Sequence, residues 1–274
     1  MLNNYLETMT KIIFRHGGNV NDIMGDGLMI LFGAPTAQAD DAARCVACAI
    51  EMQIAMEKVN KFNATNGLPP LEMGIGINTG PAVAGNLGSE MHAKYTVIGS
   101  HVNLASRVET LTIGGQVLIT ETTRDAISNP LIITSESRHP VKGFTDPIGV
   151  FEVKEIGEPY NLVLPKEQIE YHILAEPLPV SFELVDGKTV SEIVEQGRLI
   201  SLYVKSAELE TDFELEVNSS IRLHLGADEP ERPERPIAYA KVMSKKASGV
   251  YEIHYTSLPY EAFAMLDALP TDNA

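Results

Sequence analysis

The 274-residue sequence contains no tryptophan and only two cysteines, Cys45 and Cys48. Two cysteines cannot build a disulfide framework, and one Cys-x-x-Cys pair without further cysteines or suitably spaced histidines is a poor zinc motif. No apolar run approaches the roughly 18 residues of a membrane-spanning helix. The first residues also lack the basic and apolar parts of a signal peptide. We therefore expect a cytoplasmic protein with no direct membrane insertion.

Basic residues are scarce as well. The sequence has 21 Lys and Arg against 37 Asp and Glu, which gives a formal net charge of -16. This charge disfavours long-range attraction to nucleic acids or to anionic membranes. A hydrophobic content of 44% and a charged content of 21% are typical of a soluble globular protein. At about 150 residues per domain, the length favours roughly two domains.

The first part of the sequence alternates helical and strand patterns. A helix is expected at 2–15, strands at 20–24 and 28–32, a helix after Asp40-Asp41, strands at 73–80 and 82–85 around a Gly-Pro turn, a strand at 95–98, a helix after Gly99-Ser100, a strand at 114–120, a helix at 121–128, and strands at 132–135 and 149–153. The alternating glycines at 74, 76 and 80 indicate close approach of another backbone. These patterns predict an α/β domain over residues 1–156.

The second part has a different character. Gly157 to Lys166, with prolines at 159 and 165, reads as a linker. Short β-rich runs follow at 178–185, 199–204, 213–217, 221–225, 237–243 and 250–255, and only 259–269 has a helical pattern. Several short strands at close spacing predict a small β-barrel or sandwich over residues 167–274.

Three places in the first domain carry side chains suited to phosphate chemistry. Asp26 lies between two glycines at an expected hairpin tip, where a carboxylate can reach a hard cation such as Mg²⁺; an ordinary Asp-Gly turn is the alternative. Asn103 and Arg107 are four residues apart on an expected helix, so both leave the same face, and Arg suits bidentate phosphate recognition. Lys142, before a glycine, is a possible point-charge phosphate ligand. For Asn103, Arg107 and Lys142, an ordinary solvent-exposed surface position is the alternative.

In order and spacing, several motifs together resemble the catalytic domain of class III adenylate and guanylate cyclases, over roughly residues 1–155. The motifs are Gly18-Asn-Val-Asn-Asp-Ile-Met-Gly-Asp-Gly-Leu-Met-Ile-Leu-Phe-Gly-Ala-Pro35, Gly74-Ile-Gly-Ile-Asn-Thr-Gly80, Gly85-Asn-Leu-Gly-Ser89, Tyr95-Thr-Val-Ile-Gly99 and Val102-Asn-Leu-Ala-Ser-Arg107. The resemblance implies a ferredoxin-like cyclase fold of the α+β type. It also implies conversion of a nucleoside triphosphate to its 3′,5′-cyclic monophosphate and pyrophosphate, hence a lyase of intracellular signalling.

The resemblance further implies a site shared between two subunits of a head-to-tail homodimer, with two Asp-bound metal ions, Mg²⁺ or Mn²⁺. By position, Asp26 is similar to the second metal-binding Asp of the family. Asn103 is similar to the Asn that positions the ribose, and Arg107 to the Arg that stabilises charge on the transferring phosphate. Lys142 is similar to the residue that holds the distal phosphates.

The sequence departs from the family at two points. The first metal-binding Asp of the family lies on a strand upstream of the first helix, and no such segment stands in this sequence. We expect a longer parent protein; a defective cyclase, acting as a nucleotide-sensing or dimerisation module, is the alternative. At the base-selecting positions stand Asp22, where adenylate cyclases carry Lys and guanylate cyclases Glu, and Thr96. We expect ATP from Thr96 and family frequency, with GTP as the alternative.

Residues 166–269 are similar to a PilZ-type barrel in the segments 166–172, 178–184 and 197–203. The Arg-x-x-x-Arg element and the Asp/Asn-x-Ser-x-x-Gly element that bind cyclic di-GMP in that family are missing. His172 and Ser201 are the nearest remnants of these two motifs. We therefore expect a regulatory or interaction barrel with a possible protein partner and no dinucleotide ligand.

Overall fold

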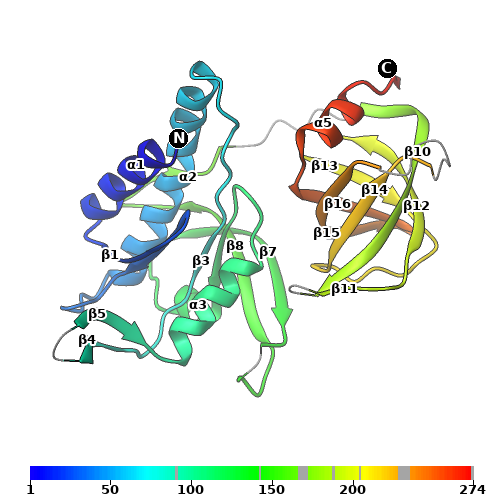
Figure 1. The fold of residues 1–274 in the computed structure, drawn as a ribbon. Helices are drawn as coiled ribbons and strands as arrows, with labels where there is room; N and C mark the ends of the chain where they lie inside the picture. Colours follow the sequence, from blue (N-terminus) through cyan, green and yellow to red (C-terminus); the bar gives the residue numbers. More distant parts are fainter. Residues whose placement is uncertain are drawn as a thin grey trace. The chain divides into compact units, whose positions relative to one another are not determined.

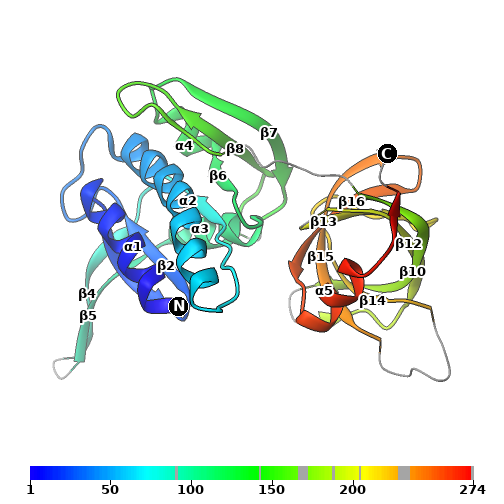
Figure 2. The same ribbon diagram turned by 90° about the horizontal axis from the view of Figure 1, so that it is seen from above.

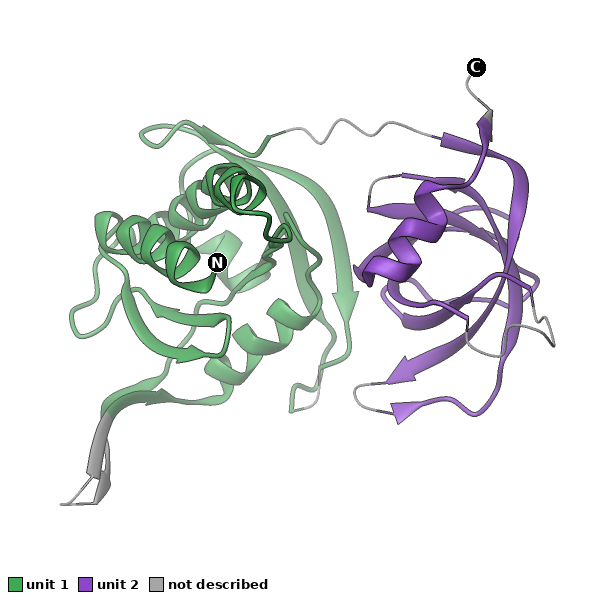
Figure 3. Ribbon diagram, turned by 45° about the horizontal axis from the view of Figure 1, so that its top comes forward, with its two compact units in different colours: residues 1–166 green, residues 167–274 purple. Residues whose placement is uncertain are grey.

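The computed structural model describes residues 1–89, 92–141, 143–165, 172–186, 189–203, 205–227 and 235–272. The chain forms two compact units, Met1–Lys166 and Glu167–Ala274 (Figure 3). Across the described ranges, every helix is too short or too polar to cross a membrane.

The described residues of unit 1 form a mixed sheet, two hairpins and four helices (Figure 1). Its elements are α1 (Leu2–Arg15), β1 (Asn19–Met24), β2 (Gly27–Leu31), α2 (Asp41–Thr65), β3 (Ile75–Ile77), β4 (Val83–Ser89), β5 (His92–Ile98), α3 (Ser100–Thr110), β6 (Val117–Thr120), α4 (Glu121–Asp125), β7 (Leu131–His139), β8 (Ile148–Ile156) and β9 (Leu162–Val163). The sheet order is β3-β6-β8-β7, with β9 added to β8. β3 and β6 are parallel, and the other neighbours are antiparallel.

α2 forms the centre of unit 1 because it is apolar on two sides. One side packs on the sheet through residues that include Val46 and Ile50. The other side packs on α1 through residues that include Met52 and Val59. Figures 1 and 2 show α1 beside α2. Cys48 is buried on the α1 side, and Cys45 is half-buried against the cluster on the sheet side.

The order of helices and strands agrees with the sequence expectations, with two differences. The strands expected at 73–80 and 82–85 do not pair with each other: β3 pairs with β6, and β4 pairs with β5. Parallel pairing requires a crossover, and here α3 supplies it. In addition, part of the expected linker belongs to the sheet, because Leu162–Val163 pairs with β8 and Leu164 is buried.

Unit 2 is a closed barrel of six antiparallel strands. The strands in order are β10 (His172–Asp186), β12 (Glu195–Leu202), β13 (Ser206–Glu210), β16 (Val250–Ser257), β15 (Ile237–Ala247) and β14 (Ser220–Leu225), and β14 pairs with β10 to close the ring. The short strands β11 (Thr189–Val190) and β17 (Thr271–Asp272) also pair with β10. α5 (Tyr260–Asp267) lies across one end of the barrel (Figure 2) and buries Ala262 and Leu266 in its core. The expectation of a mixed α/β unit followed by a small β-barrel is confirmed.

One expected strand of unit 2 was wrong. Residues 213–217 form a loop, in which the Leu215 amide donates to the Tyr251 hydroxyl at 3.2 Å. The barrel uses β13 instead, where Ala207 and Leu209 are buried and the residues between them are not. β13 was not predicted from the sequence because charged residues stand on both sides of Leu209. A strand was predicted at 213–217 because apolar residues alternate with glutamates there.

Candidate active site

Asp26 lies at the tip of the β1–β2 hairpin, as its sequence predicts. Met24 pairs with Gly27, so Gly25 and Asp26 form a two-residue turn, and Gly25 has a φ of +70° that favours glycine. The Asp26 side chain is exposed, and no hydrogen bond or ion pair holds it within the part of the chain that the structure describes. The carboxylate is therefore available to a ligand.

The hairpin is fixed to the helices at its base. Arg44 of α2 donates from Nη1 to the His16 carbonyl at 2.8 Å and from Nε to Asp40 at 2.9 Å, and it also pairs with Asp41. Its guanidinium lies 5.6 Å from the centre of the Phe32 ring, directly after β2. Arg44 thus connects the end of α1, the start of α2 and the hairpin that carries Asp26.

The pKa of the Tyr5 hydroxyl on α1 is raised from its ordinary value. Burial raises the pKa of the Tyr5 hydroxyl, and the nearby Asp26 carboxylate raises it further. The hydroxyl donates to the Met73 sulfur at 3.4 Å.

Asn103 and Arg107 leave the same face of α3, as their spacing predicts. Leu104 and Val108 bury the opposite face against the sheet. Both polar side chains are exposed, and among the described residues neither takes part in a side-chain hydrogen bond or ion pair. An exposed guanidinium without an acidic partner is suited to bind a phosphate group.

Asp22 and Thr96 lie on neighbouring hairpins. Asp22 is on β1 next to a bulge, is half-buried, and accepts from the Ile23 amide at 2.9 Å. Thr96 is on β5, is half-buried, and pairs with Gly85 of β4. β1 lies beside β5, so both residues belong to the same region of unit 1. Lys142 lies outside the described residues.

The structure leaves the candidate residues in two separate groups. Asp22 and Asp26 are on the β1–β2 hairpin, and Asn103 and Arg107 are on α3. Over the described ranges, no hydrogen bond or ion pair joins the first group to the second.

A residue that sequence reasoning missed, Asn78, contacts α3. It lies directly after β3 and bonds to the carbonyl of His101 and to Thr120. The signal available in the sequence was its position between the alternating glycines of residues 74–80.

The carboxylate of Asp26 alone supplies only some of the ligands that a divalent cation needs. Within the described ranges, no three His, Cys, Asp or Glu side chains gather where they could hold a metal ion. Mg²⁺ commonly binds through one or two carboxylates plus substrate phosphates and water. The hard, exposed oxygens of Asp26 fit one such ligand position.

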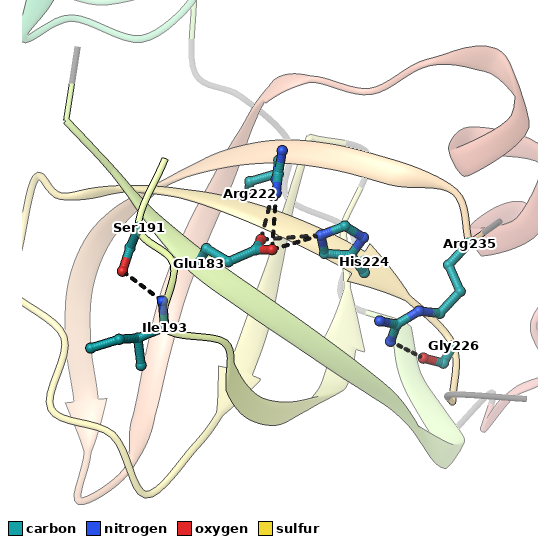
Figure 4. A network of polar contacts seen from close by, with 7 residues as sticks. All are labelled: Glu183, Ser191, Ile193, Arg222, His224, Gly226 and Arg235. Carbon is teal, nitrogen blue, oxygen red and sulfur yellow. Dashed lines mark hydrogen bonds and ion pairs between the residues drawn. The ribbon is translucent and has the colours of Figure 1, made fainter. Parts of the chain in front are cut away.

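Unit 2 carries a separate polar network on β10 and β14 (Figure 4). The buried Glu183 accepts from Arg222 Nε at 3.2 Å and Nη2 at 3.0 Å, and the His224 Nε2 lies 3.1 Å from both carboxylate oxygens. Burial alone raises the pKa of Glu183, but the bonds and charges of Arg222 and His224 outweigh burial and lower it. This network joins two strands at the closure of the barrel, so its geometry points to a structural role.

The fold and the arrangement of motifs in unit 1 define the chain as a member of a known enzyme family. The sequence profile described as "Adenylate and Guanylate cyclase catalytic domain" matches residues 1–155. The chain belongs to this family, which confirms the resemblance seen in the sequence.

Individual relatives agree with this family. The chain is 37% identical over 163 residues to an adenylate cyclase of Anabaena cylindrica, covering 56% of this chain and 31% of the relative. Among solved structures, the guanylyl cyclase Cya2 is 49% identical with a TM-score of 0.58, covering 60% of this chain and 83% of that one. The adenylyl cyclase CyaB from P. aeruginosa is 34% identical with a TM-score of 0.54, covering 57% and 82%. The chain spans less than a third of the length of the curated adenylate cyclases that it matches.

Proposed function

We propose that this chain carries the catalytic domain of a nucleotide cyclase. The reaction joins the 3′-oxygen of a nucleoside triphosphate to the α-phosphorus, releases pyrophosphate and frees the proton of the 3′-hydroxyl. The observation that carries the proposal is that Asp26, Asn103 and Arg107 are all exposed and, among the described residues, uncommitted to internal bonds. They lie on segments that the family match covers.

Each residue has a role that its chemistry supports. Asp26 holds Mg²⁺ or Mn²⁺, which when bound neutralises triphosphate charge and activates the 3′-hydroxyl. Arg107 donates to the phosphate that is being transferred, and Asn103 hydrogen-bonds the ribose and fixes its orientation. Lys142, by its place in the family motif, holds the distal phosphates. Groups that are preorganised in this way stabilise the charge of the transition state without the cost of reorienting solvent or side chains during the reaction.

Asp26 and Arg107 lie on different elements, and among the described residues neither has a hydrogen bond or ion pair to the other, so each is open to a group from a second subunit. Among the side chains that the structure describes, which leave out residues 87–94, the β1–β2 and β4–β5 hairpins expose five large apolar or aromatic ones: Ile23, Met24, Val83, Tyr95 and Ile98. β1 and β5 lie side by side (Figure 1), so these side chains gather in one region. Exposed apolar surface of this kind marks an interface. We assign it to a second copy of the chain, which brings Arg107 of one subunit to Asp26 of the other.

A product assay tests the activity. Purified protein that carries this chain together with the first metal-binding strand of the family, assayed with ATP or GTP and Mg²⁺ or Mn²⁺, should form the cyclic nucleotide and pyrophosphate, and a chelator should abolish both. Asp26→Ala and Arg107→Ala should each lower kcat by about 100-fold or more, because each removes transition-state stabilisation. Glu7→Ala, which removes an exposed acid on α1, is the control and should keep full activity. A wild-type protein of this longer form that makes no product contradicts the proposal.

The preferred substrate is ATP, with GTP as a second candidate. Thr96 and the adenylate cyclase of Anabaena cylindrica support ATP. Asp22 and the guanylyl cyclase Cya2 support GTP, because a carboxylate accepts hydrogen bonds and guanine presents N–H donors.

The substitution Asp22→Lys tests whether residue 22 selects between ATP and GTP. It replaces an acceptor by a donor, so the ratio of kcat/KM for ATP to that for GTP should rise by at least about tenfold. Competition between the two substrates in one assay measures this ratio directly. Glu57→Lys, an equal charge change on α2, should leave the ratio unchanged. A constant ratio in Asp22→Lys excludes residue 22 from base selection.

We propose a PilZ-like interaction role for the C-terminal barrel. A closed six-stranded barrel followed by a helix supports this assignment. The cyclic di-GMP motifs are missing from the sequence. Calorimetric titration of the full chain with cyclic di-GMP should therefore give no binding heat, and binding would contradict the proposed role.

A further inference from the structure

Besides the apolar packing of Leu104 and Val108, α3 and the residue that follows its last turn lie against a segment with glycines at 74, 76 and 80. A Cβ at Gly76 would lie 2.2 Å from the Glu109 backbone nitrogen, and a Cβ at Gly74 would lie 1.9 Å from the Thr112 hydroxyl. At Gly80 a Cβ would lie 2.1 Å from the His101 ring. The backbone of α3 therefore lies directly against Gly76, and this contact limits how closely the helix approaches β3.

Contact with a glycine limits only the distance of the helix from the strand, whereas a hydrogen bond is also directional and adds to the packing of Leu104 and Val108 in fixing the register. Asn78 lies in the middle of this surface and supplies such a bond. Its Nδ2 donates to the His101 carbonyl at 2.9 Å and lies 3.3 Å from His101 Nδ1. Because a carbonyl oxygen only accepts, this contact also fixes the orientation of the Asn78 amide.

The other end of the same amide is anchored in the sheet. Asn78 Oδ1 accepts from Thr120 Oγ1 at 2.8 Å and from Thr122 Oγ1 at 3.2 Å. Thr120 ends β6 and caps the N-terminus of α4. One side chain thus connects β3, the β6–α4 junction and the first turn of α3.

His101 precedes Asn103 by two residues and Arg107 by six on the same helix. Because no described residue bonds to the side chains of Asn103 and Arg107, their places depend on how α3 is seated. We propose that Asn78 is a positioning residue for the cyclase reaction, holding α3 in the register at which Arg107 meets the transferring phosphate. This inference rests on the proposed function.

The test compares Asn78→Ala with Asn60→Ala in the full chain. Asn60 makes a similar double link between α2 and the loop before β3, donating to the Leu71 carbonyl at 2.9 Å and accepting from its amide at 2.7 Å. Asn78→Ala should lower kcat by about 10- to 100-fold with KM changed less than about threefold, because misplacement affects transition-state contacts most. Asn60→Ala should lower the melting temperature and leave kcat unchanged where the protein is folded.

Hydrogen exchange gives a readout that does not depend on activity. Amides in the first turn of α3 should exchange faster in Asn78→Ala than in the wild type, and Asn60→Ala should leave them unchanged. If the exchange rates in Asn78→Ala equal those of the wild type, Asn78 does not hold the first turn of α3, and the inference is wrong. An active wild type whose Asn78→Ala variant keeps its kcat, or loses no more than Asn60→Ala, overturns the positioning role alone. A wild type without product overturns the proposed function and this role with it.

Discussion

Glu183 shows how one buried charge can stabilise a strand junction. Its carboxylate is 7% exposed and faces Arg222 and His224 on the neighbouring strand. Because the pKa of Glu183 is lowered from its ordinary value of 4.5, the ionised form is favoured in the folded chain. The resulting stability is fully present above about pH 4.5 and is lost as the pH falls through the lowered pKa.

The substitution Glu183→Gln should reduce the free energy of unfolding of the barrel by about 1–3 kcal/mol at pH 7, because it removes charge-assisted bonds and leaves Arg222 without its counter-ion. The difference from the wild type should shrink at pH 3. Urea unfolding followed by circular dichroism at both pH values measures it. Glu210→Gln, which breaks the exposed ion pair with Arg198, is the control and should change stability little. A loss of equal size at both pH values would contradict the electrostatic explanation.

Single residues differ in how far the sequence reveals them. The exposed position of Asp26 followed from its two flanking glycines, because a hairpin turn is determined by adjacent residues. Asn78 was not singled out, because its partners lie 23 and 42 residues away along the chain. Only the pairing of β3 with β6 brings those partners together. Local chemistry was therefore predictable, whereas a tether made by tertiary contacts was not.

At the scale of the elements, the position of α3 depends on a glycine of β3, where a side chain would collide with the helix. Gly76 lies under the backbone of Glu109 and Val108, where no flexible atom can move aside. Gly76→Ala should therefore displace α3 and lower the free energy of unfolding by about 1–3 kcal/mol or more. Kinetics should show a lower kcat, since Asn103 and Arg107 move with the helix.

The matched control is Gly85→Ala on β4, because a Cβ there would meet nothing within 4 Å. Thermal unfolding and the product assay on both variants separate crowding under α3 from a general effect of replacing glycine in a strand. Equal stability and activity of the two variants would show that α3 tolerates the extra methyl group.

The elements themselves were predicted to different degrees. The range expected for α1 and the start expected for α3 came close to the observed ones, because the apolar residues of both repeat at helical spacing. The alternating glycines correctly indicated a close backbone approach, but not that α3 would be the partner. β13 was missed because Ser206, Glu208 and Glu210 occupy its outer positions. The loop at 213–217 was mistaken for a strand because Phe213 and Leu215, which pack on the barrel core, alternate with glutamates.

At the scale of the whole molecule, each unit has its own core. The barrel core is formed by residues 174–266, and the clusters of unit 1 end at Leu164. The site residues all belong to unit 1, so the barrel contributes no described residue to the proposed chemistry. The sequence could predict this division from the change in pattern near residue 160. It could not show that a single copy keeps Asp26 and Arg107 unconnected, because that depends on tertiary structure.

If two copies complete the site, inactive variants should rescue each other. In a head-to-tail dimer, a mixture of Asp26→Ala and Arg107→Ala chains forms mixed dimers in which one of the two sites keeps both residues. With random pairing at equal concentrations, half of the dimers are mixed, so the mixture should recover about a quarter of wild-type activity. Each variant alone should stay inactive at the same total concentration. A mixture of Asp26→Ala with the double variant Asp26→Ala/Arg107→Ala is the control and should stay inactive, because no site in it contains Asp26. If the first mixture recovers nothing although sedimentation shows that the subunits exchange, each site lies within one chain and the shared arrangement is wrong.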